Sequence, residues 1–205
     1  MRVSREQVTA NRERIVANAA EQFRRRGFGD VTIADVMKAA GLTHGGFYGY
    51  FDSKQALEAA VCERGLAESV AAVDAVRGEE GGGDGEGSAA VEAPLRRFVD
   101  DYVSARHRDA PEEGCTVAAL ACDAGRSGPD LQHLFVSGIT GMADSLAGLR
   151  RANSPDPAGE SGPDFATLST MVGAVILSRA VAAADPELSE RILAAARERA
   201  AAPGE

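Results

Sequence analysis

Residues 32–57, TIADVMKAAGLTHGGFYGYFDSKQAL, constrain the fold more than any other stretch of the chain. Thr32 is a good helix N-cap, and Asp35 on the next turn completes an acidic variant of the capping box. Gly41 stands where a helix end favours a residue that accepts positive φ, and Thr43 is placed to cap a short second helix. Two helices joined by a short turn that contains glycine are typical of the helix-turn-helix, whose second helix enters the DNA major groove.

The same stretch resembles the signature of the TetR family of one-component transcriptional regulators. In that family a first helix ending in G-[FY] precedes T-[IV]-x-x-[IV]-A-x-x-A-G, and an aromatic-rich recognition helix then ends in Y-x-x-F-x-[SN]-K-x-x-L. One departure is Met37, which stands at a packing position where the family usually has alanine. The matching residues are Ile15, Ala19, Phe23, Gly27, Phe28, Thr32, Ile33, Val36, Ala40, Gly41, Phe47, Tyr48, Tyr50, Phe51, Lys54 and Leu57.

Charge is divided unevenly along the chain. Residues 1–56 hold nine basic and six acidic residues, a net charge of +3. The remaining residues hold 13 basic and 25 acidic residues, a net charge of -12, which gives the chain its formal charge of -9. A basic footprint confined to the amino-terminal part suits contact with DNA phosphates, and the acidic remainder keeps the rest of the molecule away from them.

The resemblance also implies which residues face double-stranded DNA. Residues 44–46 form the first turn of the recognition helix, which reads base edges. Tyr48, Tyr50 and Lys54 match positions that hold the sugar-phosphate backbone, and Thr32 lies at a helix N-terminus that favours a phosphate. The alternative for the two tyrosines is ordinary core packing with buried hydroxyl groups. The predicted DNA-binding residues are Thr32, Thr43, His44, Gly45, Gly46, Tyr48, Tyr50 and Lys54.

Residues 57–205 are expected to form a larger helical domain for ligand binding and dimerisation, after a DNA-binding domain over residues 1–56. Apolar residues recur at helical spacing and no long stretch alternates with period two, so the expected fold class is all-α. The Gly-rich acidic segment 78–88 cannot bury surface and is expected to be a flexible loop. The helices expected outside the recognition motif span residues 8–26, 54–76, 91–108, 115–125, 129–151, 163–184 and 186–201.

The helix expected over residues 163–184 is apolar nearly all round, so it must be buried on more than one side. Its natural second partner is another copy of the chain, with the Ala-rich helix 186–201 completing an intermolecular four-helix bundle. TetR-like proteins dimerise at this place, so the resemblance implies the same homodimer. The alternative is a core helix of a monomer. The predicted interface residues are Val172, Val175, Ile176, Leu188 and Ile192.

A small-molecule effector of mixed polarity or without charge is expected to bind within residues 57–205. Arg179 lies in an otherwise apolar helix and needs a partner, either a carboxylate across the dimer or an anionic ligand. Most of the other candidate lining residues can equally serve as core. The candidates are Phe98, Tyr102, Cys115, Phe135, Phe165 and Arg179.

Three cysteines are an odd and sparse number, which argues against a disulfide framework and for a reducing cytoplasm. Cys115 and Cys122 lie two helical turns apart, roughly 10 Å, which exceeds the Cα separation of about 7 Å that a disulfide spans. Each is either a small buried apolar residue or a single-thiol sensor. Cys115, at a helix N-terminus, is the more reactive candidate.

No motif for catalysis, metal binding or membrane insertion is found in the sequence. A phosphate-binding glycine loop with Lys, a G-x-S-x-G motif and zinc-ligand spacing are all missing, so we expect no enzymatic activity, no metal and no cofactor. The amino terminus is polar and charged, unlike a signal peptide, and no apolar run is long enough to span a bilayer. The expected location is therefore the cytoplasm, without membrane contact.

The resemblance implies a sequence-specific DNA-binding transcriptional regulator. The main expectation is a repressor that a small-molecule ligand releases from a pseudo-palindromic operator. The alternatives are an activator, a thiol-based redox-responsive regulator, and a DNA-bound protein-interaction adaptor.

Overall fold

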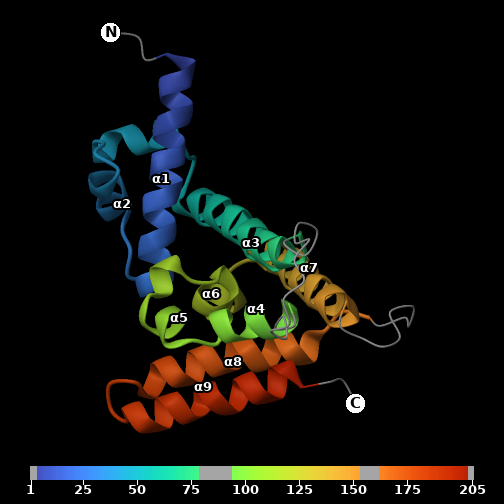
Figure 1. Ribbon diagram of the computed structural model, residues 1–205. Coiled ribbons are helices and arrows are strands. Elements are labelled where there is room, and N and C mark those ends of the chain that lie inside the picture. The colour runs from blue at the N-terminus through green and yellow to red at the C-terminus, as the bar shows by residue number, and fades with distance from the viewer. Residues whose placement is uncertain (1–3, 79–93, 153–161, 203–205) are drawn as a thin grey trace, which may run out of the picture. The chain divides into compact units, whose positions relative to one another are not determined.

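The computed structural model describes residues 4–78, 94–152 and 162–202 (Figure 1). These ranges contain helices and no strand, so the expected all-α class is confirmed. Residues 79–88 of the predicted flexible loop lie outside the described residues. The elements are α1 (Arg5–Arg26), α2 (Ile33–Ala39), the 3-10 helix η1 (His44–Gly49), α3 (Lys54–Gly78), α4 (Pro94–Tyr102), α5 (Ala105–Asp109), the 3-10 helix η3 (Pro111–Glu113), α6 (Thr116–Gly125), α7 (Pro129–Ala152), α8 (Phe165–Val181) and α9 (Pro186–Ala201).

The single helix expected over residues 91–108 is wrong, because its described part is divided into α4 and α5. Ser104 starts the second of these helices. Its hydroxyl oxygen accepts a hydrogen bond from the backbone N–H of His107 at 3.2 Å, and its carbonyl oxygen accepts one from the N–H of Arg108 at 3.0 Å. A serine that bonds the following backbone in this way begins a new helix.

The described residues fall into two compact units, and α3 and α7 contribute to both. The amino-terminal unit comprises residues 4–66 and 110–136, and the carboxy-terminal unit comprises residues 67–78, 94–109, 137–152 and 162–202. The boundary between these units differs from residue 57, and the division into a DNA-binding and a ligand-binding domain stays a prediction. The first part of α3 and all of α6 belong with the helix-turn-helix, so this compact unit is larger than the predicted DNA-binding domain.

The amino-terminal unit is built around α1, which packs against α2, η3 and α6. Ile15 and Phe23 on its inner face are fully buried, as helical periodicity predicts. Phe23 meets Phe28 edge to face, with ring centroids 5.2 Å apart. Phe47 of η1 stacks on Phe51 at 5.8 Å, and both rings are buried. These aromatic contacts hold the short η1 on the rest of the unit.

A close approach of α3 to α6 depends on Gly65. A Cβ atom built there would lie 2.2 Å from Oγ1 of Thr116, which is itself buried. Overpacking of this kind costs about 1–3 kcal/mol, whereas alanine gains only about 1 kcal/mol over glycine in helix propensity. We therefore expect Gly65→Ala to lower the unfolding temperature. In a Thr116→Ala background, which lacks the clashing oxygen and keeps only the Cβ atom at 3.3 Å, the same change should lower the unfolding temperature less. Higher unfolding temperatures in both backgrounds would contradict the close approach.

In the carboxy-terminal unit, α8 and α9 lie side by side, and α5 and α4 pack against them (Figure 1). Each of the two long helices begins with an aspartate cap. Asp164 accepts a hydrogen bond from the N–H of Thr167 at 3.0 Å, and Asp185 accepts one from the N–H of Leu188 at 2.9 Å. Pro186 occupies a first-turn position of α9, where its missing N–H costs nothing. None of the helices in the described ranges combines the length and apolar character needed to cross a membrane.

Candidate functional site

The start of α2 is fixed by the capping box that the sequence predicts. Oγ1 of Thr32 accepts a hydrogen bond from the N–H of Asp35 at 3.1 Å, and Oδ2 of Asp35 accepts one from the N–H of Thr32 at 3.0 Å. The hydrogen bond from the Thr32 backbone, followed by that from its hydroxyl, holds the pKa of Asp35 below its ordinary value. The carboxylate therefore stays ionised at neutral pH, where it favours the helix N-terminus.

The turn after α2 ends the helix in a Schellman motif. Gly41 has φ +69°, a conformation that side chains rarely adopt. Its N–H donates to the carbonyl oxygen of Lys38 at 3.1 Å, and the N–H of Leu42 donates to that of Met37 at 2.8 Å. The chain then enters η1 at Thr43, whose backbone is extended but whose side chain makes no capping bond. Thr43 is therefore the N-cap residue of η1, as the sequence predicts, but its side chain does not contribute a capping hydrogen bond.

η1 is a 3-10 helix over His44–Gly49, in the place of the expected recognition helix. Its sequence, HGGFYG, explains the tighter winding, because glycine lowers α-helix stability and the segment is short. Phe47 is fully buried, whereas His44 and Gly45 are exposed. The 3-10 helix thus presents its first residues to solvent while one aromatic residue holds it to the core.

Tyr48 is a largely exposed side chain of η1, with 64% of its surface accessible. Its ring rests edge-on against the buried Phe47, with centroids 5.3 Å apart. The alternative of a core aromatic with a buried hydroxyl therefore does not describe Tyr48. An exposed phenol on a fixed backbone suits a hydrogen bond to a phosphate. That role stays a prediction.

Unlike Tyr48, Tyr50 and Lys54 have side chains that make polar contacts within the protein. The side-chain amide of Asn11 donates to the hydroxyl oxygen of the half-buried Tyr50 at 2.8 Å. Lys54 donates to the carbonyl oxygen of Phe28, and its Nζ lies 3.7 Å from a carboxylate oxygen of Glu58. Burial raises the pKa of Glu58, although Lys54 acts in the opposite direction. In this structure Lys54 thus braces the amino-terminal unit, and its phosphate contact stays a prediction that requires the ammonium group to leave Phe28.

Sequence reasoning missed Asn11. This residue is 6% exposed and lies one helical turn before Ile15, on the apolar face of α1. A polar residue that interrupts an apolar stripe is the signal that points to it, since a buried amide requires partners.

The candidate ligand residues do not form one group within a single unit. Cys115 and Phe135 belong to the amino-terminal unit, whereas Phe98, Tyr102 and Phe165 belong to the carboxy-terminal unit. The rings of Phe98 and Tyr102 are buried with centroids 5.8 Å apart. Phe165 is 47% exposed at the start of α8. Their roles in ligand binding stay predictions.

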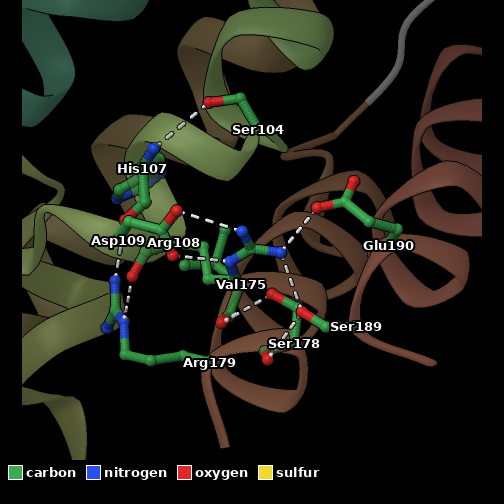
Figure 2. Close-up of polar contacts among 9 residues, drawn as sticks. All are labelled: Ser104, His107, Arg108, Asp109, Val175, Ser178, Arg179, Ser189 and Glu190. Atoms are coloured by element: carbon green, nitrogen blue, oxygen red, sulfur yellow. Dashed lines mark hydrogen bonds and ion pairs between the residues drawn. The ribbon is translucent and has the colours of Figure 1, made fainter. Parts of the chain in front are cut away.

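Arg179 donates hydrogen bonds to the end of α5. Its Nε and Nη2 donate to the carbonyl oxygens of Arg108 and His107, each at 2.9 Å (Figure 2). The last carbonyl groups of a helix lack partners within the helix, so this guanidinium group caps α5. Two of the partners that the sequence requires for Arg179 are thus backbone carbonyl groups, and a carboxylate across the dimer or an anionic ligand stays a prediction.

Figure 2 shows that a second arginine of the same cluster reaches α9. Arg108 donates to Oγ of Ser189 at 2.9 Å and to Oε1 of Glu190 at 2.7 Å. Burial lowers the pKa of the neighbouring His107, although the hydrogen bond between its Nδ1 and the carbonyl oxygen of Tyr102 acts in the opposite direction. His107 is therefore neutral at physiological pH. The cluster fastens α5 to the α8–α9 pair.

The predicted interface residues divide into exposed and buried ones. Ile176 and Leu188 are each 37% exposed, and Val172 and Ile192 are partly exposed. Val175 is 0% exposed within a single chain. Its assignment to the interface is therefore wrong, because its side chain packs inside its own unit and cannot face a second copy.

Among the three thiols, Cys62 lies in the core of the amino-terminal unit. Burial raises the pKa of Cys62 to about 12, and the carboxylates of Glu58 and Asp123 contribute in the same direction. Such a thiol stays protonated and unreactive. Cys115 is partly exposed at the N-cap of α6, and Cys122 is exposed. A sensing role for either stays a prediction.

Comparisons with known proteins agree with this arrangement. The sequence model of a family described as "Bacterial regulatory proteins, tetR family" matches residues 15–61. An uncharacterized HTH-type transcriptional regulator, YdgC of Bacillus subtilis, is 43% identical over 47 residues. That match covers 23% of this chain and 24% of the relative, so it concerns the helix-turn-helix part alone.

Solved structures extend the likeness to the whole chain. A TetR transcriptional regulator from Chloroflexus aurantiacus is 25% identical, with a TM-score of 0.69 over 95% of this chain and 94% of that one. A TetR family regulator from Cytophaga hutchinsonii is 20% identical, with a TM-score of 0.69 over 98% of this chain and 97% of that one, and it supports the fold alone. The signature residues, the capped helix-turn-helix and these matches show that residues 15–61 carry the helix-turn-helix of the TetR family of transcriptional regulators and that the chain has the fold of these regulators.

Proposed function

We propose that this regulator binds a pseudo-palindromic DNA operator as a homodimer and represses transcription until a small molecule releases it. The DNA-binding part of this proposal rests on one observation. The first residues of η1 and Tyr48 are exposed, while the buried Phe47 holds η1 to the core of its unit. The first residues of the second helix of such a motif reach base edges in the major groove. The proposed DNA-binding residues remain Thr32, Thr43, His44, Gly45, Gly46, Tyr48, Tyr50 and Lys54.

The homodimer is proposed to form through α8 and α9. Phe165, Val172 and Ile176 recur at helical spacing along one exposed or partly exposed face of α8, and Leu188 adds an exposed apolar residue from α9. Apolar side chains repeated on one surface of two adjacent helices suit a two-fold bundle with a second copy. A dimer in turn suits an operator with two half-sites about one helical turn, or roughly 34 Å, apart.

Release by a ligand is proposed because it is typical of the TetR family. Phe98 and Tyr102 form the buried aromatic pair that an apolar effector would displace or extend. Ligand and DNA would then oppose each other through a coupling free energy of about 1–3 kcal/mol, a typical allosteric magnitude.

Selection of duplexes from a random pool by the purified protein tests the proposal. At about 150 mM salt, where non-specific binding is weakened, we expect enrichment of an inverted repeat. No enrichment, with binding that only fades as salt rises, would leave the adaptor alternative as the better account. The enriched duplex then serves as the probe in a screen for molecules that release the protein.

Tyr48 and His44 are expected to have different effects on the enriched duplex. Tyr48→Ala should weaken binding about tenfold on matched and mismatched sequences alike, because it removes a bond to a charged phosphate. The salt dependence should not change, since tyrosine carries no charge. His44→Ala should instead cost about 1–3 kcal/mol at one base position and relax the preference there.

Fluorescence anisotropy over a range of salt concentrations measures both effects. Tyr48→Phe is the matched control that keeps the ring and removes only the hydroxyl group. Wild-type affinity of Tyr48→Ala would show that η1 is not the DNA-facing element.

A further inference from the structure

Asn11 is a buried polar residue of the amino-terminal unit. It is 6% exposed on α1, on the face that otherwise carries Ile15 and other apolar side chains. A buried amide is tolerated only when its donors and its acceptor are satisfied, so its hydrogen bonds explain its presence. Three of them connect it to Gln7, Arg14 and Tyr50.

The orientation of the Asn11 amide is determined by two of these bonds. Its Oδ1 accepts from Nη2 of Arg14 at 2.7 Å and from Nε2 of Gln7 at 3.0 Å. A guanidinium group can only donate, so the atom that faces Arg14 must be the oxygen. The NH2 group of Asn11 therefore faces Tyr50, whose hydroxyl oxygen lies 2.8 Å away.

This orientation determines what the Tyr50 hydroxyl group can do. An amide nitrogen cannot accept a hydrogen bond, so Tyr50 is the acceptor of the contact with Asn11, and its own hydrogen remains available. Among the described residues, no bond that uses this hydrogen is found. The positive charge of Arg14 polarises the amide, and a hydroxyl that accepts from a polarised donor becomes a stronger donor itself. The partner that fits such a donor is a negatively charged oxygen.

We propose that Asn11 is a positioning residue for DNA binding, which turns the Tyr50 hydroxyl group outward as a hydrogen-bond donor to a phosphodiester oxygen. The inference rests on the proposed function and adds a residue outside the helix-turn-helix to it. Gln7 and Arg14 act on Tyr50 indirectly, since they hold the amide of Asn11 in the orientation in which its NH2 group donates to the tyrosine.

A double-mutant cycle of Asn11→Leu and Tyr50→Phe tests the proposal. The probe is a fluorescein-labelled duplex of mixed sequence at about 50 mM salt, because phosphate contacts contribute to binding on any sequence. We expect each single change to weaken binding about tenfold, as for the loss of one hydrogen bond to a charged group. In the Tyr50→Phe background, Asn11→Leu should have no further effect, because the hydroxyl group through which it acts is gone.

Asn18→Leu is the matched control. It makes the same chemical change on the same helix, but the Asn18 amide donates only to the carbonyl oxygen of Arg14 within α1. This variant should bind as the wild type does. None of these substitutions changes a charge, so the salt dependence should be the same in all of them.

Two results would overturn the inference. One is wild-type affinity for Asn11→Leu, and the other is an equal loss in both Tyr50 backgrounds, which would mean that Asn11 merely supports the fold. Should Asn11→Leu unfold below the assay temperature, Asn11→Asp replaces it. This isosteric carboxylate still accepts from Arg14 but draws the Tyr50 hydrogen inward, so its loss of affinity should be larger with Tyr50 than with Phe at that position. A wild-type protein that binds no duplex at low salt would instead refute the proposed function itself.

Discussion

Replacing Ile176 with glutamate is expected to leave the protein monomeric and to weaken operator binding by at least about 100-fold, because the gain from engaging two half-sites at once is lost. Ile176 is 37% exposed on α8, so the single chain tolerates a charged side chain there. In a two-fold interface, however, each substitution occurs twice and buries two unpaired carboxylates. The cost of desolvating them exceeds what the neighbouring Val172 and Leu188 can offset.

Two measurements check this expectation. Sedimentation velocity gives the oligomeric state, and anisotropy compares a duplex with two half-sites to one with a single half-site. The matched control is Val136→Glu, which places the same charge at a 61% exposed position of α7 in the amino-terminal unit and should leave the dimer intact. An Ile176→Glu protein that stays dimeric at assay concentration would place the interface elsewhere.

The local elements of the helix-turn-helix could be predicted because short-range chemistry determines them. A threonine followed on the next turn by an aspartate forms a capping box wherever a helix begins, and Thr32 and Asp35 form it here. Gly41 likewise adopts the positive φ that ends a helix. The winding of η1 could not be predicted, because the four-residue spacing of Phe47 and Phe51 favours an α-helix, whereas in the structure Phe51 lies beyond the end of η1.

The break between α4 and α5 could not be predicted because distant residues stabilise it. Apolar residues continue across Tyr102 and Val103 at helical spacing, so the local pattern favours one long helix. In the structure the carbonyl oxygen of Val103 accepts a hydrogen bond from Nη1 of Arg197 at 3.0 Å, and Arg179 caps the end of α5. Both arginines come from helices far along the chain, and no local pattern encodes such contacts.

The division of α8 into a core face and an exposed face also depends on tertiary packing. A helix that is apolar nearly all round shows that both faces are covered, but it does not show which neighbour covers each face. Adjacent residues such as Val175 and Ile176 are indistinguishable in hydrophobicity, yet the first is buried within its own chain and the second is exposed.

Arg150→Met is expected to destabilise the carboxy-terminal unit by about 3 kcal/mol, which lowers the unfolding temperature by roughly 10 °C for a chain of this size. The guanidinium group of Arg150 joins three helices. Its Nε donates to Oδ2 of Asp164 at 2.8 Å, and its Nη2 donates to Oγ1 of Thr167 at 2.6 Å. The carbonyl oxygens of Ala202 and Ala200, at the end of α9, accept from Nη1 at 2.6 Å and from Nη2 at 3.2 Å. Methionine keeps the packing of the stem and removes every one of these donors.

Removing the Arg150 side chain is costly because its hydrogen-bond acceptors then lose their donor. Only 13% of the Asp164 side chain is exposed, so its carboxylate would remain largely buried and without its cation. Arg150→Lys should be intermediate, since it keeps the charge but not the planar fork. Arg199→Met, at an exposed position of α9, is the matched control and should unfold as the wild type does.

The contact between Arg150 and Asp164 should also make the stability of the protein depend on pH. Burial by itself raises the pKa of Asp164, but the hydrogen bonds from the Thr167 backbone and from Arg150 outweigh it and hold the pKa below its ordinary value. The folded protein therefore binds the proton less well than the unfolded chain, and this contribution to stability is lost as pH falls below about 4. Thermal unfolding at neutral pH and at a pH well below about 4 should give a smaller acid-induced loss in Arg150→Met than in the wild type. Equal losses would mean that the N–H of Thr167, and not Arg150, holds the carboxylate in its ionised form.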